Sequence, residues 1–195
     1  MRRRIGRVLR FAAGAGLFFA SRAEAIGGRL PPYEERIFRA ANGASDAIRV
    51  PVRAVMQAGT FVTVPIAATV AFLAGRRRLA AKLLVGGTLA WFGAKAAKPL
   101  GGRERPRGVL GDDVNVREEI EGDLGWVSGH TTVATTLAFA AGEELSAWTR
   151  PLLGGVVGAV GFGRMYVGAH LPHDIVGGAG LGMMISAVLP RGDDA

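Results

Sequence analysis

The sequence predicts an all-α protein, an integral-membrane bundle of five or six transmembrane helices. Hydrophobic residues make up 49% of the 195 residues, and many lie in long blocks with almost no charge, a pattern typical of membrane spans. Among the 30 glycines are pairs that suit close helix contact in lipid, Gly154 with Gly158 and Gly178 with Gly182. A chain of this length is expected to form one compact unit.

The net charge of +8 raises the question of a polyanionic partner. The basic residues flank the apolar blocks and do not form one stripe, so we expect membrane lipids with anionic headgroups and no nucleic acid. The absence of cysteine excludes a disulfide framework, a thiolate zinc site and a cysteine nucleophile. No feature of the sequence sets the oligomeric state.

Residues 1–50 are predicted to form a basic N-terminal segment. The charge-free apolar run at 11–20 is shorter than the ~20 residues that a span needs. Two interpretations of residues 1–25 stay open: a first transmembrane helix that uses flanking residues, or a signal peptide cleaved after "AEA" at 23–25. The sequence from 30 to 53 mixes charge with sparse apolar positions, which predicts an amphipathic helix at the membrane interface.

Residues 51–195 are predicted to form the catalytic transmembrane part. A helix starting at Pro51 is expected to run to the basic turn at 76–78, with a kink at Pro65. The next span covers 79–97, and a polar stretch rich in Gly, Arg and acids follows from Lys98 to about Trp126. The remaining spans are predicted over 130–148, 151–170 and 174–190.

Three polar clusters fall at equivalent depths in this arrangement. Lys98 and Arg105 begin the polar stretch in "KPLGGRERP", and "SGH" at 128–130 closes it and opens the next helix. "GRMYVGAHLPHD" at 163–174 joins the last two spans. In an alternating bundle all three lie on the same side of the membrane, which is the geometry that an active site needs.

The chemistry of these clusters suits phosphate. Lys98, Arg105 and Arg164 put three cations around one point, and guanidinium groups match phosphate oxygens. Ser128 and Gly129 lie where a helix begins, and the unpaired N–H groups there attract an anion. Together they predict a phosphate-binding cradle.

Two histidines can share the catalytic work in this cradle. Of His130 and His170, one imidazole can attack phosphorus while the other protonates the departing oxygen. Asp174 can accept a hydrogen bond from His170 Nδ1–H and so leave Nε2 free to attack. Pro172 disfavours helix at Leu171, so a turn is expected, with Asp174 capping the last span.

The joint pattern K-x6-RP, SGH and R-x5-H-x3-D resembles the type 2 phosphatidic acid phosphatase family, whose helical core is shared with vanadium haloperoxidases and bacterial acid phosphatases. The resemblance covers about Pro51 to Pro190. It implies that His130 is the general acid, that His170 is a nucleophile forming a phosphohistidine, and that Asp174 orients His170. It also implies phosphate binding by Lys98, Arg105, Ser128, Gly129 and Arg164.

Two positions depart from the family pattern. The family usually has Pro before SGH, where this chain has Val127, and Ser before the arginine of the third motif, where it has Gly163. Neither change removes a catalytic group, so we interpret both as tuning. His173 has no role in the motif and is expected at the interface. The family's six-span pattern favours a retained N-terminal helix.

The resemblance implies a membrane lipid phosphatase that acts on a lipid phosphomonoester or pyrophosphate without a cofactor or metal. Polyprenyl phosphates or pyrophosphates, phosphatidic acid and phosphatidylglycerol phosphate are all candidate substrates. The acidic loop at 112–123 lacks EF-hand spacing and is interpreted as solvated rather than as a metal site. Two alternatives stay open: a non-catalytic lipid-binding protein of the same fold, and a lipid-linked phosphotransferase.

Charge also predicts the orientation of the protein in a cell membrane. Short loops rich in Lys and Arg tend to stay cytoplasmic, and "MRRR" and the turn at 76–78 are such segments. With both inside, Lys98–His130 and the His170–Asp174 turn lie outside, while Arg150 and the C-terminus lie inside. The active site is therefore predicted to be extracytoplasmic, whether or not the N-terminal segment is cleaved.

Overall fold

The computed structural model describes residues 2–27 and 30–190. Within these ranges the chain is helical, with no strand and one isolated antiparallel bridge between Glu104 and Leu124. Short 3₁₀ turns cover Asp46–Ile48, Gln57–Gly59 and Gly111–Asp113. The helices are α1 (Arg2–Ile26), α2 (Pro32–Asn42), α3 (Arg49–Met56), α4 (Thr63–Leu73), α5 (Arg77–Gly101), α6 (Pro106–Leu110), α7 (Gly129–Glu144), α8 (Thr149–Tyr166) and α9 (Pro172–Val188).

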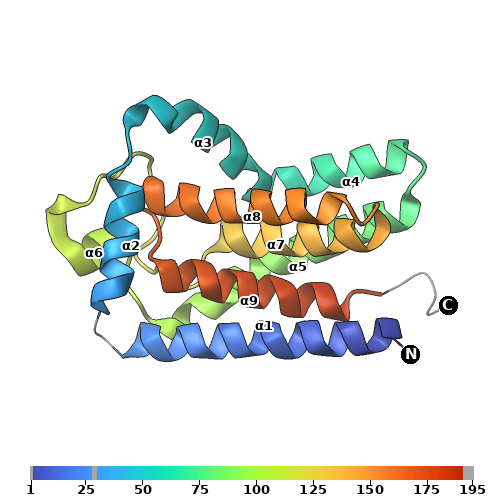
Figure 1. The fold of residues 1–195 in the computed structure, drawn as a ribbon, viewed down its shortest axis with the longest axis horizontal. Helices are drawn as coiled ribbons and strands as arrows, with labels where there is room; N and C mark the ends of the chain where they lie inside the picture. The colour runs from blue at the N-terminus through green and yellow to red at the C-terminus, as the bar shows by residue number, and fades with distance from the viewer. Residues whose placement is uncertain (1, 28–29, 191–195) are drawn as a thin grey trace.

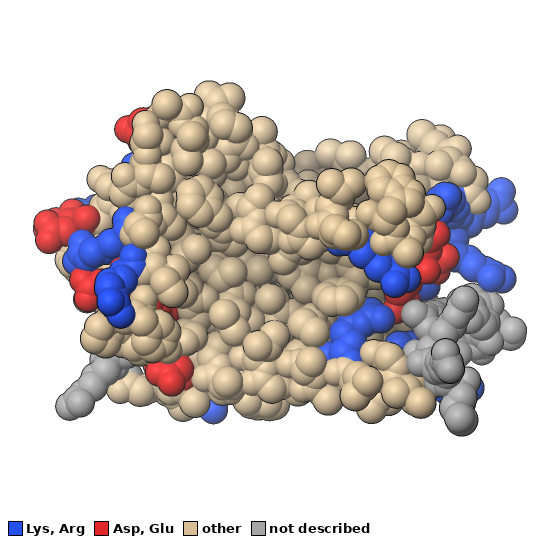
Figure 2. All heavy atoms as spheres, viewed as in Figure 1, with Lys and Arg blue, Asp and Glu red and all other residues tan. Residues whose placement is uncertain are grey.

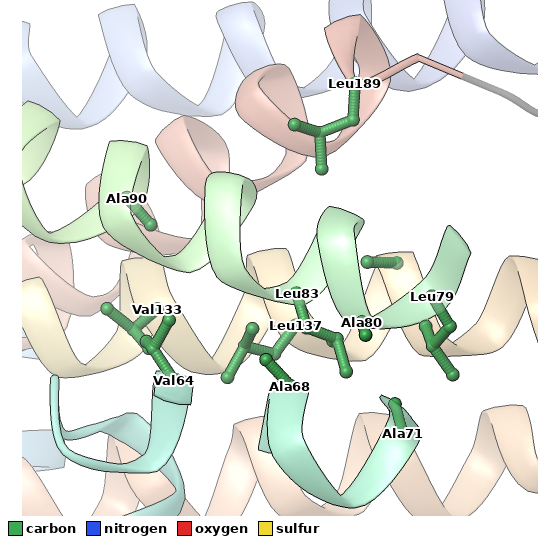
Figure 3. Packing of buried hydrophobic residues seen from close by; sticks show 11 residues of the cluster. Val64, Ala68, Ala71, Leu79, Ala80, Leu83, Ala90, Val133, Leu137 and Leu189 are labelled. Atoms are coloured by element: carbon green, nitrogen blue, oxygen red, sulfur yellow. The ribbon is translucent and has the colours of Figure 1, made fainter. Parts of the chain in front are cut away.

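The long helices α1, α5, α7, α8 and α9 run roughly alongside one another, and α2 crosses one end of the bundle (Figure 1). The largest apolar cluster lies between α4, α5 and α7, where Val64 and Ala68 meet Leu83, Val133 and Leu137 (Figure 3). A second cluster joins α1 to the segment before α7. These contacts bring the predicted polar clusters to the same end of the bundle as α2.

Helix α1 covers the N-terminal segment that the sequence leaves ambiguous. It packs along α9, and its Phe18 is buried against Trp126. Trp126 Nε1 donates a hydrogen bond of 3.1 Å to Ser21 Oγ. The choice between a retained helix and a signal peptide stays a prediction, and these contacts support the retained helix.

Large apolar side chains are exposed along several helices, including Phe19 on α1, Ile66 and Phe72 on α4, and Leu89 and Phe92 on α5. By length and hydropathy, no single helix in the described part of the chain meets the requirement for a membrane span. One bent pair meets it, Asp46–Gly59 with Thr63–Leu73, at an angle of 71°. The count of five or six spans stays a prediction.

The sequence-based prediction of one helix from Pro51 with a kink at Pro65 is wrong. Helix α3 begins at Arg49, and the break lies at 57–62, before α4. Local polar groups explain its position, because Thr60 Oγ1 and Thr63 Oγ1 both donate to the carbonyl of Gln57 and compete with helical bonding. Pro65 lies in the first turn of α4, where no helical N–H is required.

Glycines bring α9 close to its neighbours. A Cβ atom at Gly178 would lie 2.5 Å from the carbonyl oxygen of Ser128, and one at Gly182 would lie 2.7 Å from that of Thr132. This pair therefore makes the close helix contact that its spacing predicts. The other predicted pair does not, because a Cβ at Gly154 or Gly158 would meet nothing within 4 Å.

We expect Gly178→Ala to destabilise the protein and Gly158→Ala to leave its stability unchanged or slightly higher. The added methyl at 178 forces α9 away from α7, at a cost of about 1–3 kcal/mol, whereas at 158 alanine is simply the better helix former. Thermal unfolding in detergent, followed by circular dichroism, measures both variants. A Gly178→Ala protein that unfolds with the wild type would contradict this packing.

Candidate active site

Lys98 and Arg105 lie on either side of the end of α5. Lys98 is in the last turn of α5 and not in the polar loop where the sequence placed it, because the helix continues through Pro99 to Gly101. Its Nζ donates to the carbonyl of Leu124 at 2.7 Å. Arg105 immediately precedes α6 and donates from Nη1 to the carbonyl of Ala169 at 3.0 Å.

Ser128 is the N-cap of α7, so the helix begins where the sequence predicted. Its Oγ accepts hydrogen bonds from the backbone N–H and the hydroxyl of Thr131, at 3.4 and 3.0 Å. Gly129 and His130 are the first two residues of α7, so their N–H groups lie among the unpaired donors of a helix start. Ser128 is also tied to α9, because its own N–H donates to the carbonyl of Asp174 at 3.0 Å.

Arg164 is buried in the last turn of α8. Its backbone carbonyl accepts from the N–H groups of Ala169 and His170, at 3.0 and 3.2 Å. These bonds fold the chain back after α8 and bring His170 next to the end of that helix. Arg164 Nη1 donates to Glu118 Oε1 at 2.9 Å, while Arg164 Nε is buried without a hydrogen-bond partner.

The predicted hydrogen bond between His170 and Asp174 is not formed in this structure. His170 Nδ1 and Asp174 Oδ2 are 3.5 Å apart, and His170 Nδ1 has no hydrogen-bond partner. Asp174 Oδ2 instead accepts from the backbone N–H of Leu171 at 2.8 Å. The turn before α9 is as predicted, but Asp174 caps the helix from its third position, because α9 already begins at Pro172.

The electrostatic surroundings of His170 favour a neutral imidazole. Complete burial, followed by the positive charges of Arg164, Lys98 and Arg105, holds the pKa of His170 well below its ordinary value. A neutral imidazole has a free lone pair on one nitrogen, as a nucleophile requires. The structure therefore brings the three predicted cations around the predicted nucleophile.

The two departures from the family motif have packing consequences. Val127 is fully buried in the cluster of Phe18, Trp126, Ala94 and Ala97. A Cβ at Gly163 would collide with the side chain of Met56 on α3. Glycine at 163 therefore lets α8 pack closely on α3, which is a structural reason for the absence of serine there.

Sequence reasoning missed a second charged cluster beside Asp174. Arg103, between α5 and α6, forms a bidentate ion pair with Glu34 on α2, with distances of 2.9 and 2.7 Å. One signal was available, because Glu34 lies on the same face of α2 as the buried Phe38 and Ala41. Arg103 carries no comparable signal in the sequence.

His173 belongs to this second cluster. Its backbone N–H donates to Glu34 Oε1 at 2.9 Å, and its Nε2 lies 3.2 Å from the hydroxyl of Tyr33. These contacts turn His173 toward α2. They occupy both the backbone and the ring of a residue for which the motif gives no role.

The acidic loop at 112–123 pairs with arginines. Asp112 Oδ1 accepts from Arg107, and Glu118 accepts from Arg164. In the part of the chain that the structure describes, no three His, Asp or Glu side chains are grouped so that they could hold a metal ion. Glu118 is thus linked to the predicted phosphate site, which the sequence alone did not indicate.

Comparisons with known proteins agree with this arrangement. LpxE from Aquifex aeolicus aligns with a TM-score of 0.69 at 22% identity, covering 77% of this chain and 90% of that one. The transmembrane PAP2 type phosphatidylglycerolphosphate phosphatase from Bacillus subtilis aligns with a TM-score of 0.50 at 20% identity, covering 95% and 93%. No curated protein matches the chain significantly.

At these identities the two structures establish a shared fold. The family is established by sequence, because the model of the PAP2 superfamily matches residues 78–193, a range that contains all the predicted site residues from Lys98 to Asp174. The chain belongs to the PAP2 superfamily.

Proposed function

We propose that the protein is a membrane lipid phosphatase that removes phosphate from a lipid phosphomonoester or pyrophosphate. The observation that carries this proposal is the convergence of Arg164, Lys98 and Arg105 on the buried imidazole of His170. Three fixed cations around a nucleophile can neutralise the charge that develops on a phosphoryl group in transfer. Large apolar side chains exposed on α1, α4 and α5 suit a lipid environment.

In the first chemical step His170 Nε2 attacks phosphorus, and the bond from phosphorus to the lipid oxygen breaks. His130, protonated, gives its proton to that oxygen as it departs. A bound phosphate dianion favours the protonated form of His130, because it brings negative charge next to the imidazole. The products of this step are the dephosphorylated lipid and a phosphohistidine at His170.

In the second step water attacks the phosphohistidine. His130, now neutral, accepts a proton from the attacking water, and the bond from phosphorus to His170 Nε2 breaks to release inorganic phosphate. Asp174 lies 3.5 Å from His170 Nδ1, so a small rotation completes the hydrogen bond that orients the ring. The fixed cations take the role that metal ions have in other phosphatases, so we propose a metal-independent reaction.

The proposed substrate class follows from the site and from the fold. The cradle selects a terminal phosphate, and one structural neighbour is named as a phosphatidylglycerolphosphate phosphatase. We therefore propose phosphatidylglycerol phosphate, phosphatidic acid and polyprenyl phosphates or pyrophosphates as the panel to be assayed. Phosphate release from one of them in detergent separates an enzyme from a non-catalytic lipid-binding protein.

Replacement of His170 with Ala is expected to reduce turnover by at least roughly 10³-fold, because the bond-forming nitrogen is lost. Replacement of His130 with Ala is expected to cost about 10²–10⁴-fold, with the smallest effect on substrates that have good leaving groups. Phosphate release by the purified variants measures both effects. Wild-type activity in a folded His170→Ala protein would rule out the assigned nucleophile.

Vanadate is expected to inhibit competitively, because it can adopt the five-coordinate geometry of the phosphoryl group in transfer. Glu118→Gln should strengthen this inhibition roughly fivefold, since an ion pair worth about 1 kcal/mol no longer competes for Arg164. Glu119→Gln, at a neighbouring exposed position, is the control. Steady-state inhibition in the presence of EDTA gives the measurement, and activity abolished by EDTA and restored by Mg²⁺ would contradict the proposed chemistry.

We also propose that the active site faces away from the cytoplasm. Lys and Arg gather at the end of the bundle where α4 meets α5, together with a smaller number of acidic side chains, and the end near α2 also carries both signs of charge (Figure 2). Arg7, Arg10, Arg76 and Arg150 lie at the first end, in contact with the ends of α7 and α9. The site residues lie at the opposite ends of these helices.

Single cysteines test this orientation directly in a chain that has none of its own. We expect Asp112→Cys in intact cells to react with a membrane-impermeant maleimide and Ala74→Cys to react only after permeabilisation. Ala74 is exposed and avoids the strain that a side chain would meet at Gly75, whose φ is 75°. The reverse labelling pattern would place the site in the cytoplasm.

A further inference from the structure

The second charged cluster gives Asp174 its closest positive charge. Arg103 Nη1 lies 3.8 Å from Asp174 Oδ1, an oxygen that has no hydrogen-bond partner. The side chains of Asp174 and Glu34 are 0% exposed and that of Arg103 is 6% exposed. Three charged groups from α2, α9 and the segment after α5 are thus buried together, next to the predicted nucleophile.

Such a cluster is costly to bury. An isolated buried ion pair is often no better for stability than an apolar pair of similar volume. The bidentate geometry fixes the guanidinium of Arg103 in one plane, and its Nη1, which donates to Glu34 Oε1, also lies near Asp174 Oδ1. Glu34 in turn is held by the backbone N–H of His173, the residue next to Asp174. The Arg103–Glu34 ion pair and the bond from the His173 N–H together restrict the position of the Asp174 carboxylate and keep Arg103 beside it.

We propose that Arg103 and Glu34 are positioning residues for catalysis: Arg103 keeps Asp174 ionised and aimed at His170, and Glu34 holds Arg103 in place. The inference rests on the proposed function, and it adds two residues outside the three motifs to the catalytic machinery. Arg103 acts by its positive charge near Asp174 Oδ1. Glu34 acts through Arg103, by fixing its orientation and offsetting part of its charge.

Arg103 and Glu34 carry opposite charges, so their removal is expected to shift the ionisation of Asp174 in opposite directions. As a carboxylate, Asp174 is a stronger acceptor for the Nδ1–H of His170 than as a neutral carboxyl group. Arg103 favours the carboxylate and Glu34 disfavours it. Burial raises the pKa of Glu34, but the hydrogen bonds from Arg103 and from the His173 N–H outweigh it and lower that pKa below its ordinary value, so Glu34 is itself a charged group.

Substitutions at Arg103 and Glu34 leave the other ionisable groups near Asp174 unchanged. These groups lie on the elements packed against Asp174: α5, the start of α6, the turn before α9 and α9 itself. The groups are Lys98, Arg105, His170 and His173. Because they are the same in every variant, a difference in pH dependence between variants reports on Arg103 and Glu34.

The experiment compares the pH–rate profiles of four variants with that of the wild type, using phosphatidic acid in detergent micelles and the other lipids of the panel. Arg103→Met should move the acid limb to higher pH by about one unit or more, and Glu34→Gln should move it to lower pH. The double variant should lie close to the wild type, because the two effects oppose each other. Arg107→Met, an exposed arginine on α6 paired with Asp112, should leave the profile unchanged.

The double variant also covers the case in which Arg103→Met fails to fold, since a neutral pair leaves no uncompensated charge. The proposal would be overturned if the acid limbs of Arg103→Met and Glu34→Gln coincided with that of the wild type, or if both moved in the same direction. So would equal losses of kcat at every pH that follow a fall in melting temperature, because that is the result of a structural role alone. A wild type that neither hydrolyses the panel nor binds vanadate would instead contradict the proposed function, and the inference with it.

Discussion

The close approach of α9 to α7 is the constraint on which the candidate site depends. At Gly178 the two helices come so near that a side chain would strike the Ser128 carbonyl. One turn further, the N–H of Ser128 donates to the carbonyl of Asp174. The start of α7, which carries His130, is therefore fixed to the start of α9, which carries Asp174. A wider separation would part the two halves of the proposed catalytic site.

The remaining site residues reach this junction through helix ends. Lys98 comes from the last turn of α5 and Arg164 from the last turn of α8, while Arg105 holds the turn before α9 through the carbonyl of Ala169. The last turn of a helix is held by the helix before it, so it can place a long cationic side chain at the site without a long loop. The polar segment between α6 and α7 then supplies carbonyl oxygens and Glu118 as partners for these cations.

Much of this arrangement could be predicted from the sequence. Apolar blocks located α5, α7, α8 and α9, the end of the polar stretch at 128–130 located the start of α7, and Pro172 indicated the turn before α9. These features depend on residues close together in the chain. The break at 57–62 was assigned to Pro65, because proline is a stronger sequence signal than two threonine hydroxyls that bond to one carbonyl.

Contacts between distant residues were the features that sequence reasoning could not supply. Glu34 and Arg103 belong to different helical segments, and neither is part of a motif. Glu118 gave no sign of its partner in a loop of many acids. The distance of 3.5 Å from His170 Nδ1 to Asp174 Oδ2, an oxygen that already accepts from the Leu171 N–H, is likewise set by three-dimensional packing.

The central claim is that His170 is the nucleophile, and trapping the covalent intermediate tests it most directly. The protein is mixed with a lipid phosphate labelled with ³²P, quenched with alkali within milliseconds to seconds, digested and analysed by mass spectrometry. The account predicts an alkali-stable, acid-labile phosphoryl group on the peptide that contains His170, and none in His170→Ala. A phosphoryl group on another residue, or rapid turnover with no trapped intermediate under any quench condition, would contradict it.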